Sequence, residues 1–343
     1  MNLTTILSFM TSLIGIVHGT GDYIGLSGIE RLINDEQYSS FRKCQAFGVK
    51  MHEAMMANKS MMGTPSRTIT EKSVSFLLFT QTTPGNQKIL ISDNMNETLS
   101  GSDFNISRET VIYVHGLHET WHLGGLSFVN ILLSRKDINL IITNWDSYAF
   151  STFMYSRNVT TPILSQIIGK FVQKLIDFGT DSKKIHLIGH SAGGQAVALA
   201  AKMVTPKVGR ITAYDPQGSC FSFLPPDQRI SKEDADYVEI VHCTVGSHGM
   251  PLNITGDSTF YMNGGLLQPY CRHQPVPLMA GCSHMLCEVY LYLSLLNKSP
   301  LKGYKCDSYQ DYLNNQCDFN DTVILTYDVP TNITGMYFVN TMA

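Results

Sequence analysis

Two short stretches of the chain have residue types at spacings that hydrolases use. Residues 118–122 read HETWH, a match to H-E-x-x-H, which on a helix would hold zinc between two imidazoles with Glu119 as the general base. Residues 189–193 read GHSAG, a match to G-x-S-x-G, in which a serine on a tight turn acts as a nucleophile. The two patterns predict different enzymes, a zinc hydrolase and a serine hydrolase.

The serine pattern stands between segments that suit it. Residues 184–188 read KIHLI, which indicates a strand, and residues 192–204 form an alanine-rich stretch that predicts a helix. Glycine is needed at 189 and 193 because larger side chains would collide with the neighbouring strand and helix. Ser191 would then be raised to the carboxyl edge of a sheet, in front of the free N–H groups of a helix N-terminus. The alternative is a plain strand-to-helix turn with a surface serine.

A serine hydroxyl needs a base to remove its proton and a carboxylate to orient that base. In this kind of fold the chain order is Ser, then Asp or Glu, then His. Asp215 ends the predicted strand 210–215 and Pro216 stops it, although a turn-forming Asp-Pro is the alternative. We favour His284 as the base because it lies between two cysteines at the start of a predicted helix. The other downstream histidines are His242, which reads as a packed strand residue, and His248 and His273, which fall in loops.

The reaction also needs donors for the oxyanion of the tetrahedral intermediate. The N–H of Ala192, directly after the nucleophile, is one expected donor. Residues 110–116 read TVIYVHG, a short strand that ends in His-Gly, and the N–H of Leu117 is the other.

This assignment leaves no helix for the zinc pattern. Glycines at 116, 124 and 125 bracket residues 118–122, which indicates a loop. Position 128, where an extended zinc motif requires a third histidine, is Phe128. We therefore expect no metal and no organic cofactor.

The elements around these residues alternate between strand and helix. Strands are predicted at 73–81, 88–92, 110–116, 139–145, 184–189, 210–215 and 237–243, and helices at 160–179, 192–204 and 284–296. Such alternation predicts an α/β fold with a mostly parallel sheet and helices on both faces. No linker divides residues 73–298, so one domain over residues 20–343 is expected.

The bulk composition sets the class of partner. The chain has 343 residues, 43% of them hydrophobic, and a formal net charge of −3. These numbers allow a large core and give no electrostatic case for nucleic acid.

Three features indicate a secreted glycoprotein. Residues 1–19 are apolar and end in small residues, as in a signal peptide, although they have no basic n-region and could be a first helix of the fold. Eight cysteines favour disulfides over free thiols. N-x-S/T sequons are present at Asn58, Asn96, Asn105, Asn158, Asn253, Asn320 and Asn332, with Asn297 disfavoured by Pro300.

From about Ser73 to Cys317 the chain resembles the pancreatic lipase family of secreted carboxylester hydrolases. The segments that carry the resemblance are VIYVHG, LIITNWD, KIHLIGHSAGG, RITAYDPQGSCF, GDSTFYMNGGLLQPYC and CSHMLCEVYLYLSL. The resemblance implies an α/β-hydrolase fold, the triad Ser191, Asp215 and His284, and Leu117 and Ala192 as oxyanion donors. It also implies disulfides Cys271–Cys282 and Cys306–Cys317. For Cys44, Cys220, Cys243 and Cys287 three pairings are open, and we lean towards 220–243 with 44–287.

The chain departs from the family at several positions near the site. The family usually has leucine where Ala192 stands and Ala-His where Gly194-Gln195 stands, and its Asp-Trp appears here as Asn144-Trp145-Asp146. None of these changes removes a catalytic group.

The resemblance also narrows the substrate. The family's lid is closed by two cysteines, here Cys271 and Cys282, and encloses only RHQPVPLMAG. So short a lid resembles the phospholipase A1 members, such as those of wasp venoms, and Val276, Leu278 and Met279 would form a small membrane-contacting tip. The chain ends soon after Cys317, without the C-terminal β-sandwich that binds colipase in larger members, so no protein cofactor is implied.

We therefore expect a secreted phospholipase A1 that releases the sn-1 fatty acid at a membrane or micelle surface. A triacylglycerol or galactolipid lipase is one alternative. The other, from a different class, is a non-catalytic lipid-binding protein of the yolk type.

Overall fold

The computed structural model describes residues 69–83, 88–90, 94–121, 125–274, 276–296 and 301–341. The predicted signal segment 1–19 lies outside these residues, as do Cys44, Asn58, His122 and Asn297.

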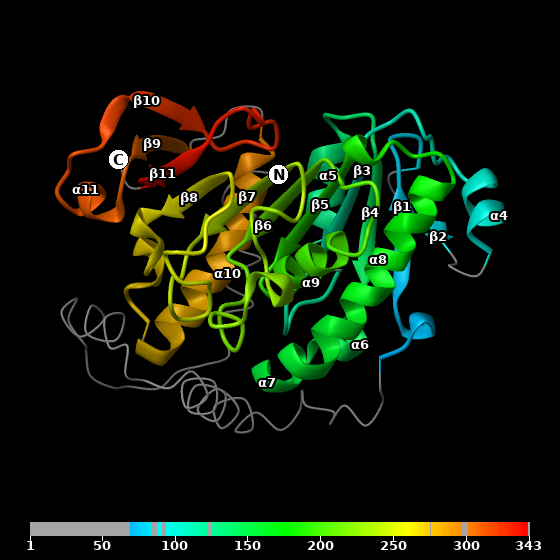
Figure 1. The fold of residues 1–343 in the computed structure, drawn as a ribbon, viewed down its shortest axis with the longest axis horizontal. Helices are drawn as coiled ribbons and strands as arrows, with labels where there is room; N and C mark the ends of the chain where they lie inside the picture. Colours follow the sequence, from blue (N-terminus) through cyan, green and yellow to red (C-terminus); the bar gives the residue numbers. More distant parts are fainter. Residues whose placement is uncertain are drawn as a thin grey trace.

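The described strands join into one sheet (Figure 1). Its strands are β1 (Ser75–Phe79), β2 (Lys88–Leu90), β3 (Thr110–Val114), β4 (Asn139–Asn144), β5 (Ile185–His190), β6 (Arg210–Tyr214), β7 (Tyr237–His242), β8 (Ser258–Met262), β9 (Lys302–Cys306), β10 (Asp318–Ile324) and β11 (Gly335–Val339). Their order is β10-β9-β11-β8-β7-β6-β5-β3-β4-β1-β2. Strands β3 to β8 and β11 are joined by parallel pairings, whereas β1, β2, β9 and β10 pair antiparallel. The α/β-hydrolase architecture expected from the sequence is thus confirmed.

Helices cover both faces of this sheet (Figure 1). They are α4 (Met95–Ser100), α5 (Gly125–Leu133), α6 (Asp146–Ala149), α7 (Phe153–Tyr155), α8 (Thr161–Asp177), α9 (Ala192–Ala201), α10 (Val276–Ser294) and α11 (Tyr309–Leu313). Strand β3 shows why two layers are needed. Its side chains alternate, so that Ile112 and Val114 join the core under α8 and α9, while Val111 and Tyr113 join the core under α5 and α10.

Helix α10 begins eight residues earlier than the sequence analysis placed it, at Val276 in place of His284. The family resemblance implied a cysteine-closed lid over residues 271–282. Proline is tolerated in the first turn of a helix, where its missing N–H would have no acceptor, so the helix extends through Pro277. His284 consequently lies inside the helix.

Both pairs that we favoured for Cys44, Cys220, Cys243 and Cys287 are wrong. Cys243 bonds to Cys287, in place of the 220–243 and 44–287 pairs. The end of β7 lies against α10, and this contact could not be read from spacing alone. Cys220 is also disulfide-bonded, and Cys44 lies outside the described residues. Cys271–Cys282 and Cys306–Cys317 are present as the family resemblance implied.

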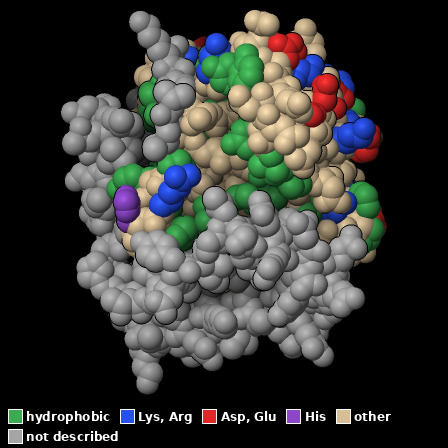
Figure 2. All heavy atoms as spheres, turned by 90° about the vertical axis from the view of Figure 1, so that its left-hand side faces the viewer, with side chains coloured by type: hydrophobic (Ala, Val, Ile, Leu, Met, Phe, Trp, Pro, Cys, Tyr) green, Lys and Arg blue, Asp and Glu red, His purple; other side chains and the backbone are tan. Residues whose placement is uncertain are grey.

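The last strands of the chain were not predicted. β10 forms one edge of the sheet, and its residues are mostly exposed. Figure 2, which views the molecule from this end, shows acidic and basic side chains interspersed there, and Lys305 of β9 pairs with Asp321 of β10 at 3.4 Å. Charges on an edge strand disfavour pairing with a second chain. Within the described residues no helix is long and apolar enough to cross a membrane.

Candidate active site

Ser191 occupies a strained turn between β5 and α9. Its φ of 54° and ψ of −120° lie outside the regions that side chains favour. A methyl group on Gly189 would lie 2.4 Å from the backbone of Gly193, and one on Gly193 would lie 2.1 Å from the carbonyl oxygen of Val114. The structure therefore leaves no room for a larger side chain at either glycine, as expected from the sequence.

Asp215 directly follows β6 and is fully buried. Its Oδ1 accepts hydrogen bonds from the backbone N–H groups of Cys243 (2.8 Å) and Thr244 (3.0 Å), and its Oδ2 accepts one from the Thr244 hydroxyl. Burial alone would raise the pKa of Asp215, but the bonds from His284, Thr244 and Cys243 outweigh it and lower that pKa to about 2. The group is therefore a carboxylate throughout the neutral range.

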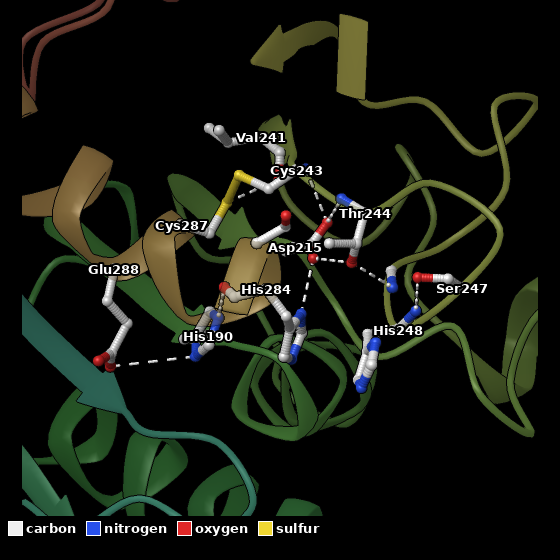
Figure 3. A network of polar contacts seen from close by, with 12 residues as sticks. His190, Asp215, Val241, Cys243, Thr244, Ser247, His248, His284, Cys287 and Glu288 are labelled. Carbon is white, nitrogen blue, oxygen red and sulfur yellow. Dashed lines mark hydrogen bonds and ion pairs between the residues drawn. A yellow bond between two sulfur atoms is a disulfide. The ribbon is translucent and has the colours of Figure 1, made fainter. Parts of the chain in front are cut away.

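His284 is the histidine that meets this carboxylate. Its Nδ1 donates to Oδ2 of Asp215 at 2.6 Å (Figure 3). A proton fixed on Nδ1 leaves Nε2 as the proton acceptor of the neutral ring. The ring of His190, the residue before Ser191, has its centroid 4.7 Å from that of His284. His284 and Asp215 are thus in direct contact, and Ser191 is joined to them through the adjacent His190, whose Nε2 bonds to the main-chain oxygen of His284. Each of the three residues is at most 7% exposed.

The other downstream histidines have different surroundings. His242 is packed in β7, as expected, and its Nε2 bonds to the carbonyl of Ile254. His248 is buried and stacks on the His284 ring at 5.1 Å, where burial lowers its pKa to about 3 and keeps it neutral. His273 is exposed in the loop before α10.

The segment after β3 lies directly beside the serine. A methyl group on Gly116 would be 2.7 Å from Cβ of Ser191. Leu117 follows Gly116 in a turn, and Ala192 is the first residue of α9, where helix N–H groups have no acceptor within the helix. Both residues expected as oxyanion donors are therefore next to the nucleophile.

The zinc pattern is not helical in its described part. His118 has a φ of 62° and lies in a turn, and Glu119 follows it outside any helix. Glu119 points inward instead, where its Oε2 accepts the N–H of Gly116 at 2.6 Å. His122 lies outside the described residues.

The sequence analysis gave four polar residues near the triad no role in a serine hydrolase site. Thr244 binds Asp215, while Glu119, His190 and Glu288 form a buried group behind the serine. One signal for Glu288 was available, since it stands four residues after His284 on the same helix face. His190 was visible only as the variable position of the serine motif.

The segment between Cys271 and Cys282 is only partly an exposed tip. Met279, expected to contact a membrane, is buried in the core between α10 and the sheet, and Leu278 is half-buried. These residues belong to the first turns of α10, whose inner face packs on the sheet. Tyr270, just before the segment, is 52% exposed.

The described sequons lie on the surface. Their asparagine side chains are all exposed, namely Asn96, Asn105, Asn158, Asn253, Asn320 and Asn332. Each is thus accessible to a glycosylating enzyme.

Comparison with known proteins points to one family. A family profile described as Lipase matches residues 38–321. Lipase member H of Danio rerio is 32% identical over 72% of this chain and 55% of its own length, and Phospholipase A1 member A of Rattus norvegicus is 32% identical over 72% and 54%. The chain thus spans little more than half the length of these relatives. Among solved structures, a phospholipase/carboxylesterase from Dyadobacter fermentans is 15% identical, with a TM-score of 0.34 over 45% of this chain and 75% of its own.

Proposed function

This chain belongs to the lipase family, and we propose that it is a serine carboxylester hydrolase that acts as a phospholipase A1. The observation that carries the proposal is the 2.6 Å bond between His284 and the ionised Asp215, beside a serine on a strained strand-to-helix turn. In the proposal these three residues are the catalytic triad.

The proposed reaction has two halves. His284 Nε2 removes the hydroxyl proton of Ser191, whose oxygen attacks the ester carbonyl, and the oxyanion is bound by the N–H groups of Leu117 and Ala192. His284 then donates the proton to the leaving lysophospholipid, and an acyl-serine remains. A water molecule, deprotonated by His284, attacks that acyl group, and His284 returns the proton to the Ser191 oxygen as the acyl–serine bond breaks and the fatty acid is released. Asp215 keeps Nδ1 protonated and stabilises the imidazolium in both halves.

Two features support a phospholipid as the substrate. The cysteine-closed segment 271–282 is short, and part of it belongs to α10, so it leaves little chain to cover the site. A relative whose name specifies phospholipase A1 aligns with 72% of the chain. We propose cleavage at sn-1, at the surface of a membrane or micelle.

A single assay tests the reaction and its position. Phosphatidylcholine with different acyl chains at sn-1 and sn-2 is incubated with the secreted protein and with Ser191→Ala. We expect release of the sn-1 acid alone and no release by the variant. Hydrolysis of triacylglycerol or galactolipid with phospholipid left intact would replace the substrate proposal, whereas hydrolysis of none would favour a lipid-binding protein.

We also propose that the protein is secreted and glycosylated, with residues 20–343 as one hydrolase domain after a cleaved segment 1–19. The disulfides and the exposed sequon asparagines support this. Expression in secreting cells should give medium protein that begins near residue 20 and loses mass on enzymatic deglycosylation. Retention of the full chain inside the cell would contradict it.

A further inference from the structure

A second polar group lies directly behind the proposed triad. Glu119, His190 and Glu288 come from the loop after β3, from β5 and from α10, and they are 5%, 0% and 6% exposed. His190 Nδ1 lies 2.6 Å from Oε1 of Glu119. It also lies 3.9 Å from Oε1 of Glu288, a contact that Figure 3 draws as a dashed line. Tyr113 of β3 donates its hydroxyl proton to Glu288 at 2.8 Å.

The hydrogen bonds of His190 decide where its protons are. Its Nε2 lies 3.1 Å from the main-chain oxygen of His284, and a carbonyl can only accept, so Nε2 carries a proton. Its Nδ1 faces Glu119, so His190 and Glu119 are either an ion pair or a neutral pair that shares one proton. Both arrangements give the pair a net charge of zero inside the protein.

Each end of this pair binds a different part of the site. Glu119 Oε2 accepts the N–H of Gly116, the residue before Leu117, at 2.6 Å. His190 bonds to the main chain of His284 from the other side and is itself bonded covalently to Ser191. The loop of the proposed oxyanion donor, the nucleophile and the helix of the proposed base are thus linked through two side chains.

We infer that Glu119 and His190 are positioning residues of the hydrolase, holding the Leu117 loop and the His284 helix in a fixed relation to Ser191. The inference rests on the proposed function. A buried polar pair costs desolvation that apolar residues would avoid, so its direct bonds to three parts of the site indicate a geometric role. A metal does not explain the group as well, because both oxygens of Glu119 already form hydrogen bonds with protein groups.

Glu288 gives the network a dependence on pH. Burial and the neighbouring Glu119 raise the pKa of Glu288 to about 8, so at neutral pH it is an uncharged acid beside the pair. The groups that face this cluster from the elements packed on it are Glu119, His190, Tyr113, Tyr292, His115 and His284. Above pH 8 a negative charge would form on Glu288, next to Glu119, and disturb the bonds that hold the Gly116 loop.

The decisive variant is Glu119→Leu. Leucine has no polar side-chain atom, so it can bind neither the N–H of Gly116 nor Nδ1 of His190, whichever residue of the pair carries the shared proton. We expect kcat on phosphatidylcholine to fall at least 30-fold with KM within threefold of wild type, and the labelling rate of Ser191 by a fluorophosphonate to fall in parallel. Glu233→Leu, an exposed matched change, should alter neither value. A cooperative thermal transition for each variant shows that it is folded.

Glu288→Gln tests the pH dependence separately, since it imitates the uncharged acid. Wild type should lose kcat as pH rises through about 8, and this variant should keep it to higher pH. Parallel profiles for the two proteins would overturn the role of Glu288, and kcat of Glu119→Leu within twofold of an active wild type would overturn the inference alone. If wild type hydrolyses no ester and is not labelled, the proposed function fails, and the positioning role fails with it.

Discussion

At the scale of single residues, Asp215 illustrates how the site resolves opposing electrostatic effects. A carboxyl group this deeply buried would ordinarily take up a proton, because desolvation penalises its charge. Two backbone N–H groups, a hydroxyl and an imidazole point at its two oxygens and reverse that preference. The loop that follows β7 supplies three of these donors, and α10 supplies the fourth through His284. Both elements therefore keep Asp215 ionised.

Asp215→Asn should lower kcat by about 10³–10⁴-fold, because an amide cannot hold the proton on Nδ1 of His284. The measurement is kcat on phosphatidylcholine across pH, with Asp227→Asn, on an exposed loop, as the control. Since the pKa of Asp215 is about 2, its charge persists from neutral pH down to that value. If wild-type activity is lost between pH 4 and 7, Asp215 should still be ionised over that range. An infrared signal for a protonated Asp215 at pH 5 would contradict this.

Two glycines near the site should respond oppositely to alanine. In Gly193→Ala the new methyl group would meet the Val114 carbonyl at 2.1 Å, so we expect a loss of at least about 3 kcal/mol in unfolding free energy. In the part of the chain that the structure describes, an added methyl group on Gly281, inside α10, would have no atom within 4 Å apart from its own stretch of helix. Gly281→Ala should raise stability by about 0.5–1 kcal/mol. Urea denaturation measures both, and equal effects would contradict the packing described for the elbow.

At the scale of elements, the alternation of strand and helix could be predicted because periodicity reports burial. The strands from β3 to β7 are almost wholly buried and read as mostly apolar runs. The start of α10 could not be predicted, because proline and glycine are disfavoured in helix interiors and that segment contains both. Strands β9 to β11 are partly exposed, so their sequences show no mostly apolar run.

The Cys243–Cys287 disulfide joins the two elements that hold Asp215 and His284. Cys243 donates its N–H to Asp215, and Cys287 lies one turn after His284 on α10. The sequence alone could not predict that Cys243 pairs with Cys287, because the pairing depends on where α10 crosses the sheet.

Replacing both Cys243 and Cys287 by serine should destabilise the fold by about 4 kcal/mol, since the bond closes a loop of 44 residues. It should also lower kcat, because α10 is no longer tied to the Asp215 loop. The double change at Cys306 and Cys317, which closes 11 residues far from the triad, should cost about 3 kcal/mol and leave kcat unchanged. Calorimetry and kcat together test this, and equal loss of kcat in both proteins would contradict it.

At the scale of the whole molecule, buried carboxyls make stability depend on pH. The pKa of Glu288 is about 8 when folded against 4.5 as a free side chain. Between these values the unfolded chain binds fewer protons than the native one, so stability falls as pH rises. Its contribution is fully present below pH 4.5 and is lost as pH passes 8.

Urea denaturation of wild type and Glu288→Gln should show this difference. The free energy of unfolding of wild type, relative to the variant, should fall by on the order of 1 kcal/mol per pH unit between pH 5 and 8. Curves that keep a constant separation over this range would contradict the assignment.

The three proposed catalytic residues could be chosen from the sequence, whereas the buried residues that contact them could not. Ser191, Asp215 and His284 could be chosen because motif, chain order and strand ends restrict them. Glu119 and Glu288 could not, because a buried carboxyl has no sequence pattern that separates it from an exposed one.

The most direct test of the account is to label the secreted protein with a fluorophosphonate and locate the adduct by peptide mass spectrometry. The account predicts one adduct, on Ser191, absent in Ser191→Ala and formed at least 100-fold more slowly in His284→Gln. An adduct on another serine, or labelling of Ser191 at the same rate without His284, would contradict the proposed triad.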